Sequence, residues 1–138
     1  MSQFKKVSLS PRIKIIQKVY GHLMNPEEKI LYPKSQYRKF IKDVVEGTIE
    51  RKELIEEKIE KYLINDINLQ RTDKILKIIL FCAIFEFLFK HNNPKKVVIS
   101  EYLKASEHFL EKAQVKYLNA ILDKISVFIK KDWLSTKF

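Results

Sequence analysis

The stretch DKILKIILFCAIFEFLFK, residues 73–90, decides the fold class of this chain. Every residue from Ile78 to Phe85 is apolar, and only Glu86 separates that run from Phe87-Leu88-Phe89. A helix that is apolar on nearly all sides is buried between other elements. The continuous apolar run is shorter than the roughly 20 residues needed to cross a bilayer. We therefore expect this stretch to form a core helix rather than a membrane span.

The composition favours a single all-α domain. The 138 residues are 46% hydrophobic, which is enough for one sizeable core, and they include only two Gly and four Pro, too few for a hairpin-rich β fold. The only cysteine, Cys82, lies inside the core stretch, where no disulfide could use it, and the N-terminus lacks the apolar segment of a secretory signal. These features predict a cytoplasmic protein.

Helical periodicity and helix stop signals divide the chain into two halves. A first helix begins at Ser10-Pro11, with a predicted buried stripe, and a long helix runs from about Ser35 to about Ile64, in which Gly47 marks a close crossing or a bend. Polar residues 65–68 form the junction before the core helix. The predicted boundaries are about 8–66 for the N-terminal half, about 67–131 for the C-terminal half and 132–138 for a frayed tail. The predicted buried stripe of the first helix consists of Ile13, Ile16, Tyr20, Leu23 and Met24.

The net charge of +10 points to an anionic partner, with nucleic acid as the first candidate. Only four of the 27 basic residues are arginines, so the codon bias of an A+T-rich genome is an alternative source of the surplus. The distribution is more informative than the total, because no acidic residue precedes Met24. The basic residues of this acid-free segment that we assign to RNA phosphates are Lys5, Lys6, Arg12, Lys14 and Lys18.

The sequence carries no catalytic or metal-binding signal. Two isolated glycines cannot form a phosphate-cradling loop. His22, His91 and His108 lack metal-ligand spacing, and Cys82 has no companion for zinc. We expect a protein that is not an enzyme and needs no cofactor or metal.

Four segments, in order along the chain, follow patterns that occur together in one known family. Arg12, Gln17 and Tyr20 match a pattern of Arg followed by Gln-x-x-Tyr, and Ala83-Ile84-Phe85-Glu86-Phe87 is similar to Ala-Leu-Tyr-Glu-Leu. The segment Lys96-Val97-Val98-Ile99-Ser100-Glu101 is similar to Lys-Val-x-Ile-Asn-Glu. The last segment, Lys116-Tyr117-Leu118-Asn119-Ala120-Ile121-Leu122-Asp123-Lys124, follows Lys-Phe-Val-Asn-Gly-Val-Leu-Asp-Lys. Together they resemble the NusB family of bacterial transcription antitermination factors.

This resemblance implies two three-helix-like subdomains packed around the central apolar helix. It also implies a protein that pairs with ribosomal protein S10 (NusE) and binds boxA RNA. The pair would join the elongating RNA polymerase through other Nus factors and support rRNA transcription. The alternative is a protein scaffold or ribosome-biogenesis factor that keeps the partner interface without reading boxA. Whether the free protein forms a homodimer stays open.

Three residues of the last helix complete the predicted RNA-binding set. Tyr117 lies at the border of the apolar stripe, where it is either a platform for a stacked base or a half-buried core residue. Lys116 points outward beside it. Asn119 is either a base contact or a helix-packing residue.

Tyr20 and Glu86 are the predicted partner-binding residues, because the resemblance places the S10-binding surface there. Glu86 shares its helix face with Ile79 and Cys82, so its carboxylate interrupts an apolar surface. Either Lys90, four residues on, or a cationic group of a partner would then neutralise Glu86. Core packing is the alternative for Tyr20.

Besides exchanges between similar apolar or aromatic residues, three departures from the family pattern bear on function. Phe81 stands where an Arg is usual, Ser100 replaces Asn, and Ala120 replaces Gly. The loss of the Arg removes a charge near the core helix. These departures bear on RNA affinity and partner geometry more than on the fold.

Overall fold

A computed structural model describes the backbone of residues 10–137 and the side chains of residues 10–129. Within that range every regular element is a helix, which confirms the all-α prediction, and none of the helices there has the length and apolar character to span a bilayer. The helices are α2 Pro11–Met24, α3 Arg38–Glu50, α4 Lys52–Leu63, α5 Lys74–Phe89, α6 Lys95–Ser106 and α7 Lys112–Lys137.

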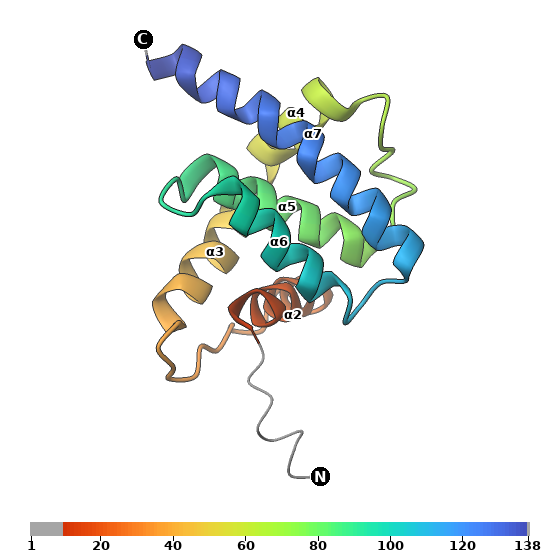
Figure 1. Ribbon diagram of the computed structural model, residues 1–138. Helices are drawn as coiled ribbons and strands as arrows, with labels where there is room; N and C mark the ends of the chain where they lie inside the picture. Colours follow the sequence, from red (N-terminus) through yellow and green to blue (C-terminus); the bar gives the residue numbers. More distant parts are fainter. Residues whose placement is uncertain (1–9, 138) are drawn as a thin grey trace.

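Helix α5 is the centre of the molecule, as the sequence predicted. Asp73 caps it by accepting a hydrogen bond from the Leu76 amide at 3.0 Å. All residues from Ile78 to Phe87 are buried, including Glu86. In Figure 1, α7 lies above α5, α6 in front of it and α2 below it. Each of the other five helices contacts α5, so its apolar surface is covered on all sides.

Helix α2 begins at Ser10-Pro11 as predicted, but it is rotated relative to the predicted stripe. Its buried residues include Arg12, whereas Tyr20, Leu23 and Met24 are exposed. The sequence analysis assigned Arg12, with Lys14 and Lys18 of the same helix, to RNA phosphates. The helix instead turns Arg12 inward, toward the carboxylate of Glu86.

The predicted single helix from 35 to 64 is in fact two helices that meet at Arg51, whose backbone leaves the helical region (φ −105°, ψ 24°). A methyl group at Gly47 would lie 2.2 Å from Cζ of the buried Phe85. Only glycine therefore lets α3 approach α5 this closely. The expectation that Gly47 marks a close crossing is confirmed.

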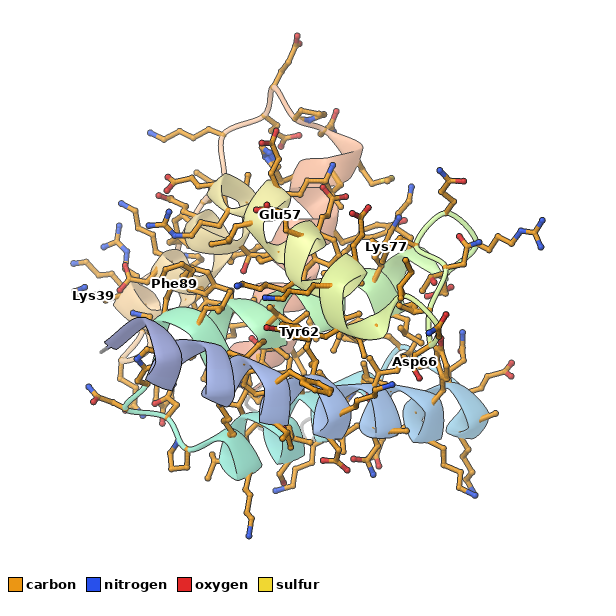
Figure 2. The ribbon with its side chains drawn as sticks, turned by 90° about the horizontal axis from the view of Figure 1, so that it is seen from above. Lys39, Glu57, Tyr62, Asp66, Lys77 and Phe89 are labelled. Carbon is orange, nitrogen blue, oxygen red and sulfur yellow. The ribbon has the colours of Figure 1, made fainter. Side chains whose placement is uncertain are left out.

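The loop from 64 to 73 is held against α7. The Tyr117 hydroxyl donates to the Asp66 carbonyl at 2.5 Å, and Lys124 pairs with the Asp66 carboxylate at 2.7 Å. Nearby, the Tyr62 and Phe128 rings stack at 4.9 Å between centroids. Figure 2 shows Tyr62 and Asp66 beside α7. The backbone of α7 stays helical to Lys137, beyond the predicted start of the frayed end, since no Gly or Pro follows its first residue.

Candidate functional site

Glu86 is the acceptor at the centre of a buried polar cluster. Its carboxylate accepts two hydrogen bonds from Arg12 on α2, at 2.7 Å from Nη2 and 3.1 Å from Nε. It also accepts from the Tyr102 hydroxyl at 2.6 Å and from the Asn93 side-chain amide at 3.2 Å. The carboxylate is fully buried, and these donors come from α2, α6 and the turn after α5. Such a bidentate, charge-assisted pair fixes the relative position of the helices that carry it.

The Arg12 guanidinium is enclosed by aromatic rings as well as paired. It lies 5.1 Å from the centroid of Phe40 and 5.4 Å from that of Tyr102. Burial by itself would lower the pKa of Arg12, but the hydrogen bonds and the charge of Glu86 outweigh it and raise that pKa. Burial, followed by the nearby charge of Glu86, holds the pKa of Tyr102 well above its ordinary value, so Tyr102 stays a donor to the carboxylate.

This geometry corrects two expectations for Glu86 and one for Arg12. Glu86 does not pair with Lys90, whose ammonium instead lies 3.3 Å from the Asp43 carboxylate. Nor does Glu86 present its charge at the surface for a partner, because an arginine of its own chain neutralises it. Arg12 is buried in that pair and does not present its guanidinium to RNA phosphates.

A basic hollow of about 400 Å³ lies between α2, the loop after it and the start of α3. Lys18 is held there, because its ammonium donates to the Leu31 carbonyl at 2.6 Å and lies 5.5 Å from the Tyr32 ring centroid. In the described part of the chain, none of the other cations that line the hollow is paired with a carboxylate. The polar and cationic side chains lining it are Lys14, Gln17, Lys18, Lys34 and Arg38.

The first turn of α3 adds to the positive character of this hollow. Arg38 is the first residue of α3, and the N-cap residue Tyr37 makes no side-chain capping hydrogen bond. The partial positive charge of a helix N-terminus therefore lies beside the cationic side chains. Lys5 and Lys6 lie outside the described residues.

The candidates on α7 form a second surface. Lys116 and Asn119 are exposed and, three residues apart, share a helix face. The ring of Tyr117 is 41% exposed while its hydroxyl is anchored to Asp66, and burial together with the nearby Asp66 charge raises the pKa of Tyr117. Helices α2 and α7 lie on different sides of α5 (Figure 1), so these residues do not join the basic hollow.

Tyr20 lies on an exposed apolar strip at the end of α2. Its side chain is 38% exposed, and Leu23 and Met24, one turn further along, are also exposed. Core packing is therefore not the role of Tyr20. Tyr20 faces solvent, whereas Glu86 is enclosed.

Sequence reasoning missed Lys34 and Arg38 in the hollow and Tyr102 and Asn93 around Glu86. The hollow residues come from a loop and a helix start whose position depends on the tertiary fold, so no local pattern identifies them. Tyr102 did carry a signal. At helical spacing it shares a face with the apolar residues Val98 and Ala105, and a tyrosine hydroxyl buried on such a face needs a hydrogen-bond partner.

Among the described residues, His, Cys, Asp and Glu side chains form no group of three that could hold a metal ion. Burial raises the pKa of the Cys82 thiol to about 12. A thiol in that state is a poor nucleophile and a poor metal ligand. The chemistry that the exposed residues offer is binding, through cations, amides and aromatic rings.

The model of the NusB family matches residues 9–127 of the chain. Similar proteins include the "Transcription antitermination protein NusB" of Nitrobacter hamburgensis, 33% identical over 87 residues that cover 63% of this chain and 54% of that protein. The protein of the same name from Thermodesulfovibrio yellowstonii is 33% identical over 92 residues, 67% of this chain and 60% of the relative. The chain thus spans little more than half the length of these curated relatives.

A solved structure of NusB from T. maritima has the same fold. Its TM-score with this chain is 0.73 at 21% sequence identity, and the match covers 84% of this chain and 87% of that one. At this identity the likeness concerns the fold.

Proposed function

The chain belongs to the NusB family of transcription antitermination proteins, and on that basis we propose that it binds boxA-type RNA together with ribosomal protein S10 (NusE). The bound pair would join the elongating RNA polymerase through other Nus factors and promote rRNA transcription. The proposed role is binding, without an enzymatic step.

The observation that supports RNA binding most directly is the basic hollow. Lys14, Lys34 and Arg38 bring positive charge from α2, the following loop and α3 to one concave surface, without a paired carboxylate in the described part of the chain. Cationic side chains of this kind bind the sugar-phosphate backbone and supply affinity, but they do not distinguish one RNA sequence from another. We propose that RNA phosphates occupy this hollow, next to Lys18.

Discrimination between RNA sequences would come from side chains of α7. Single-stranded RNA is read by aromatic rings that stack on bases and by polar groups that bond to base edges. Tyr117 offers a half-exposed ring whose orientation is fixed through its hydroxyl. We propose that Tyr117 stacks on a base, with Lys116 contacting a phosphate and Asn119 a base edge.

For the ribosomal protein, we propose docking on the exposed strip that contains Tyr20. Tyrosine is enriched at protein interfaces because its ring is apolar while its hydroxyl forms a hydrogen bond. Glu86 would act only indirectly, by holding Arg12 and therefore α2 in place.

The test compares two variants that lose the same charge. Changing Lys14, Lys34 and Arg38 together to Gln should weaken binding to boxA and to scrambled RNA alike. It should also flatten the salt dependence, by about 0.7 in the slope of log K against log salt for each phosphate that the variant no longer neutralises. The matched control changes Lys52, Arg71 and Lys74 to Gln, three exposed cations outside the hollow. Equal salt slopes for the two variants would refute the assignment of the hollow.

The ribosomal partner is tested by titrating boxA and scrambled RNA with and without S10. The proposal predicts that S10 raises the affinity for boxA more than that for scrambled RNA, and that Tyr20→Asp removes this gain. If S10 binds the chain but boxA and scrambled RNA remain indistinguishable, the chain is a scaffold that does not read boxA.

A further inference from the structure

A second concave surface lies where α2, the α3–α4 junction and α5 meet. This pocket has a volume of about 320 Å³, and apolar side chains form most of its wall. Those that define it are Val19 and Leu23 of α2, Ile49 of α3, and Ile78 and Phe81 of α5. Its volume is at the small end of the range for ligand sites, so it fits one or two apolar groups rather than a large cofactor.

Phe81 of α5 forms part of the pocket wall. It stands where the family pattern has an Arg, and only 8% of its surface is exposed. The substitution replaces a long cation with an aromatic ring on the pocket wall. Leu23, at the mouth, is 43% exposed. An apolar side chain of a partner could therefore contact both residues at once and remove them from water.

The rim of the pocket is basic. Lys52, Lys74 and Lys77 line it, against a single carboxylate, Glu56. Within the described residues neither Lys52 nor Lys74 forms an ion pair, and both are exposed. Lys77 donates to the Leu69 carbonyl at 3.1 Å, which places its ammonium beside the loop before α5 (Figure 2). The rim therefore favours an acidic partner.

Two enclosed polar groups also belong to residues that line the pocket. Nδ1 of His22 is shielded from solvent and makes no hydrogen bond within the described part of the chain. The Thr48 hydroxyl is almost fully buried, and the group that faces it is the Cys82 thiol, which bonds only weakly. Buried polar groups without strong partners are uncommon. Because both atoms are shielded from solvent, an occupant of the open pocket would contact the surrounding apolar and basic side chains instead.

We propose that this pocket binds a short acidic, amphipathic helical segment of a protein partner. One large apolar side chain of the segment enters between Leu23 and Phe81. Carboxylates on either side of that anchor contact Lys52 and Lys74. This is the general mode in which a helix lays its apolar face into a groove. The proposed site is distinct from the basic hollow. It shares Leu23 with the strip on which we propose that the ribosomal protein docks, so peptide binding is measured without RNA and without that protein.

The probe is a fluorescein-labelled 16-residue helical peptide with Leu and Phe on one face and Glu on the other. Its matched control has every Glu replaced by Lys. Fluorescence anisotropy with the full chain should show the acidic peptide binding at least about tenfold more tightly than the basic one, with an affinity that falls as salt is added. Equal binding of the two peptides would overturn the proposal.

Two variants of the chain locate the site. Leu23→Glu, at an exposed position, should leave folding intact and reduce binding of the acidic peptide by at least about tenfold, because it places a like charge and no apolar surface at the mouth. Phe81→Ala should also weaken binding, because it removes the aromatic ring that the apolar anchor of the peptide contacts. Wild-type affinity in folded Leu23→Glu protein would refute the assignment.

Sodium decanoate and boxA RNA complete the experiment. If decanoate perturbs the His22 NMR signals while neither peptide binds, the pocket accepts small amphiphiles and the peptide proposal fails. In the absence of the ribosomal protein, the RNA affinity of Leu23→Glu should equal that of the wild type. A loss of RNA affinity in this variant would contradict the separation of the two sites, whereas failure of the hollow variants alone would leave the pocket proposal standing.

Discussion

Glu86→Gln tests the buried pair by removing its charge while keeping its shape. The carboxylate accepts four hydrogen bonds, two from Arg12 and one each from Tyr102 and Asn93. A glutamine has one acceptor oxygen, and its amide would face a donor. Side-chain exposure is 10% for Arg12 and 0% for Glu86, so solvent does not screen the charge that is left unpaired. Breaking such a buried pair costs about 3–5 kcal/mol, a large share of the usual 5–15 kcal/mol of domain stability.

Urea unfolding followed by far-UV circular dichroism measures this loss as a drop in the transition midpoint at constant m-value. The matched control is Asp43→Asn, which breaks ion pairs to Lys39 and Lys90 at 3.1 and 3.3 Å. Because Lys39 is almost fully exposed, we expect that control to cost less than about 1 kcal/mol.

A double variant separates charge from packing. Arg12→Met with Glu86→Leu removes both charges and should be more stable than Glu86→Gln alone, since no buried ion is left unpaired. Recovery should be partial, because Tyr102 and Asn93 lose their acceptor. A loss for Glu86→Gln no larger than that of the surface control would refute the argument that this pair holds α2 on α5.

Other side chains give three more tests. Gly47→Ala should destabilise the protein by about 1–3 kcal/mol in thermal unfolding, because the added methyl group overlaps the ring of Phe85. The control is Gly21→Ala, whose methyl group meets no atom within 4 Å and should be neutral or stabilising. Equal effects of the two substitutions would contradict the close crossing. Tyr102→Phe should make the loss of folding stability above pH 10.0 less steep than in the wild type. The pKa of Tyr102 is raised in the folded state, so its contribution to stability is complete below the unfolded pKa of 10.0 and is lost as pH rises toward the folded pKa. Identical pH profiles of stability for the two proteins would contradict this prediction. Tyr117→Ala should cost about 1–3 kcal/mol of RNA affinity and Tyr117→Phe much less; if the alanine variant instead mainly lowers the unfolding midpoint, Tyr117 serves packing.

The fold was predictable where local pattern and tertiary burial agree. The apolar run of α5 admits no exposed face, and Ser10-Pro11 and Asp73 are caps whose chemistry is local. The break at Arg51 was not predictable in this way, because residues 35–64 contain no proline and their helical periodicity continues through it. The close approach of Gly47 to Phe85 was likewise not readable from local pattern, because it joins residues far apart in the sequence.

The predicted site was less complete, for a related physical reason. Cations were assigned to the surface because an unpaired buried charge is costly. That assignment fails for Arg12, since Glu86, 74 positions further along, accepts its hydrogen bonds. Lys14 and Lys18 do reach a concave surface, but the loop residue Lys34 and the helix start at Arg38 complete it. Only the folded chain brings these groups together.

Arg12 and Glu86 therefore illustrate how a family pattern relates to function. Both belong to the segments that carry the resemblance, and both are buried in one ion pair. Their presence in the pattern is explained by the packing of α2 on α5, whereas binding to RNA or to a protein requires exposed groups. The proposed contacts with RNA and the ribosomal protein therefore rest on residues outside that pair. Tyr20 is an exposed member of the pattern, and Tyr117 is exposed where the pattern has Phe. Phe81, which stands where the pattern has Arg, lines the apolar pocket.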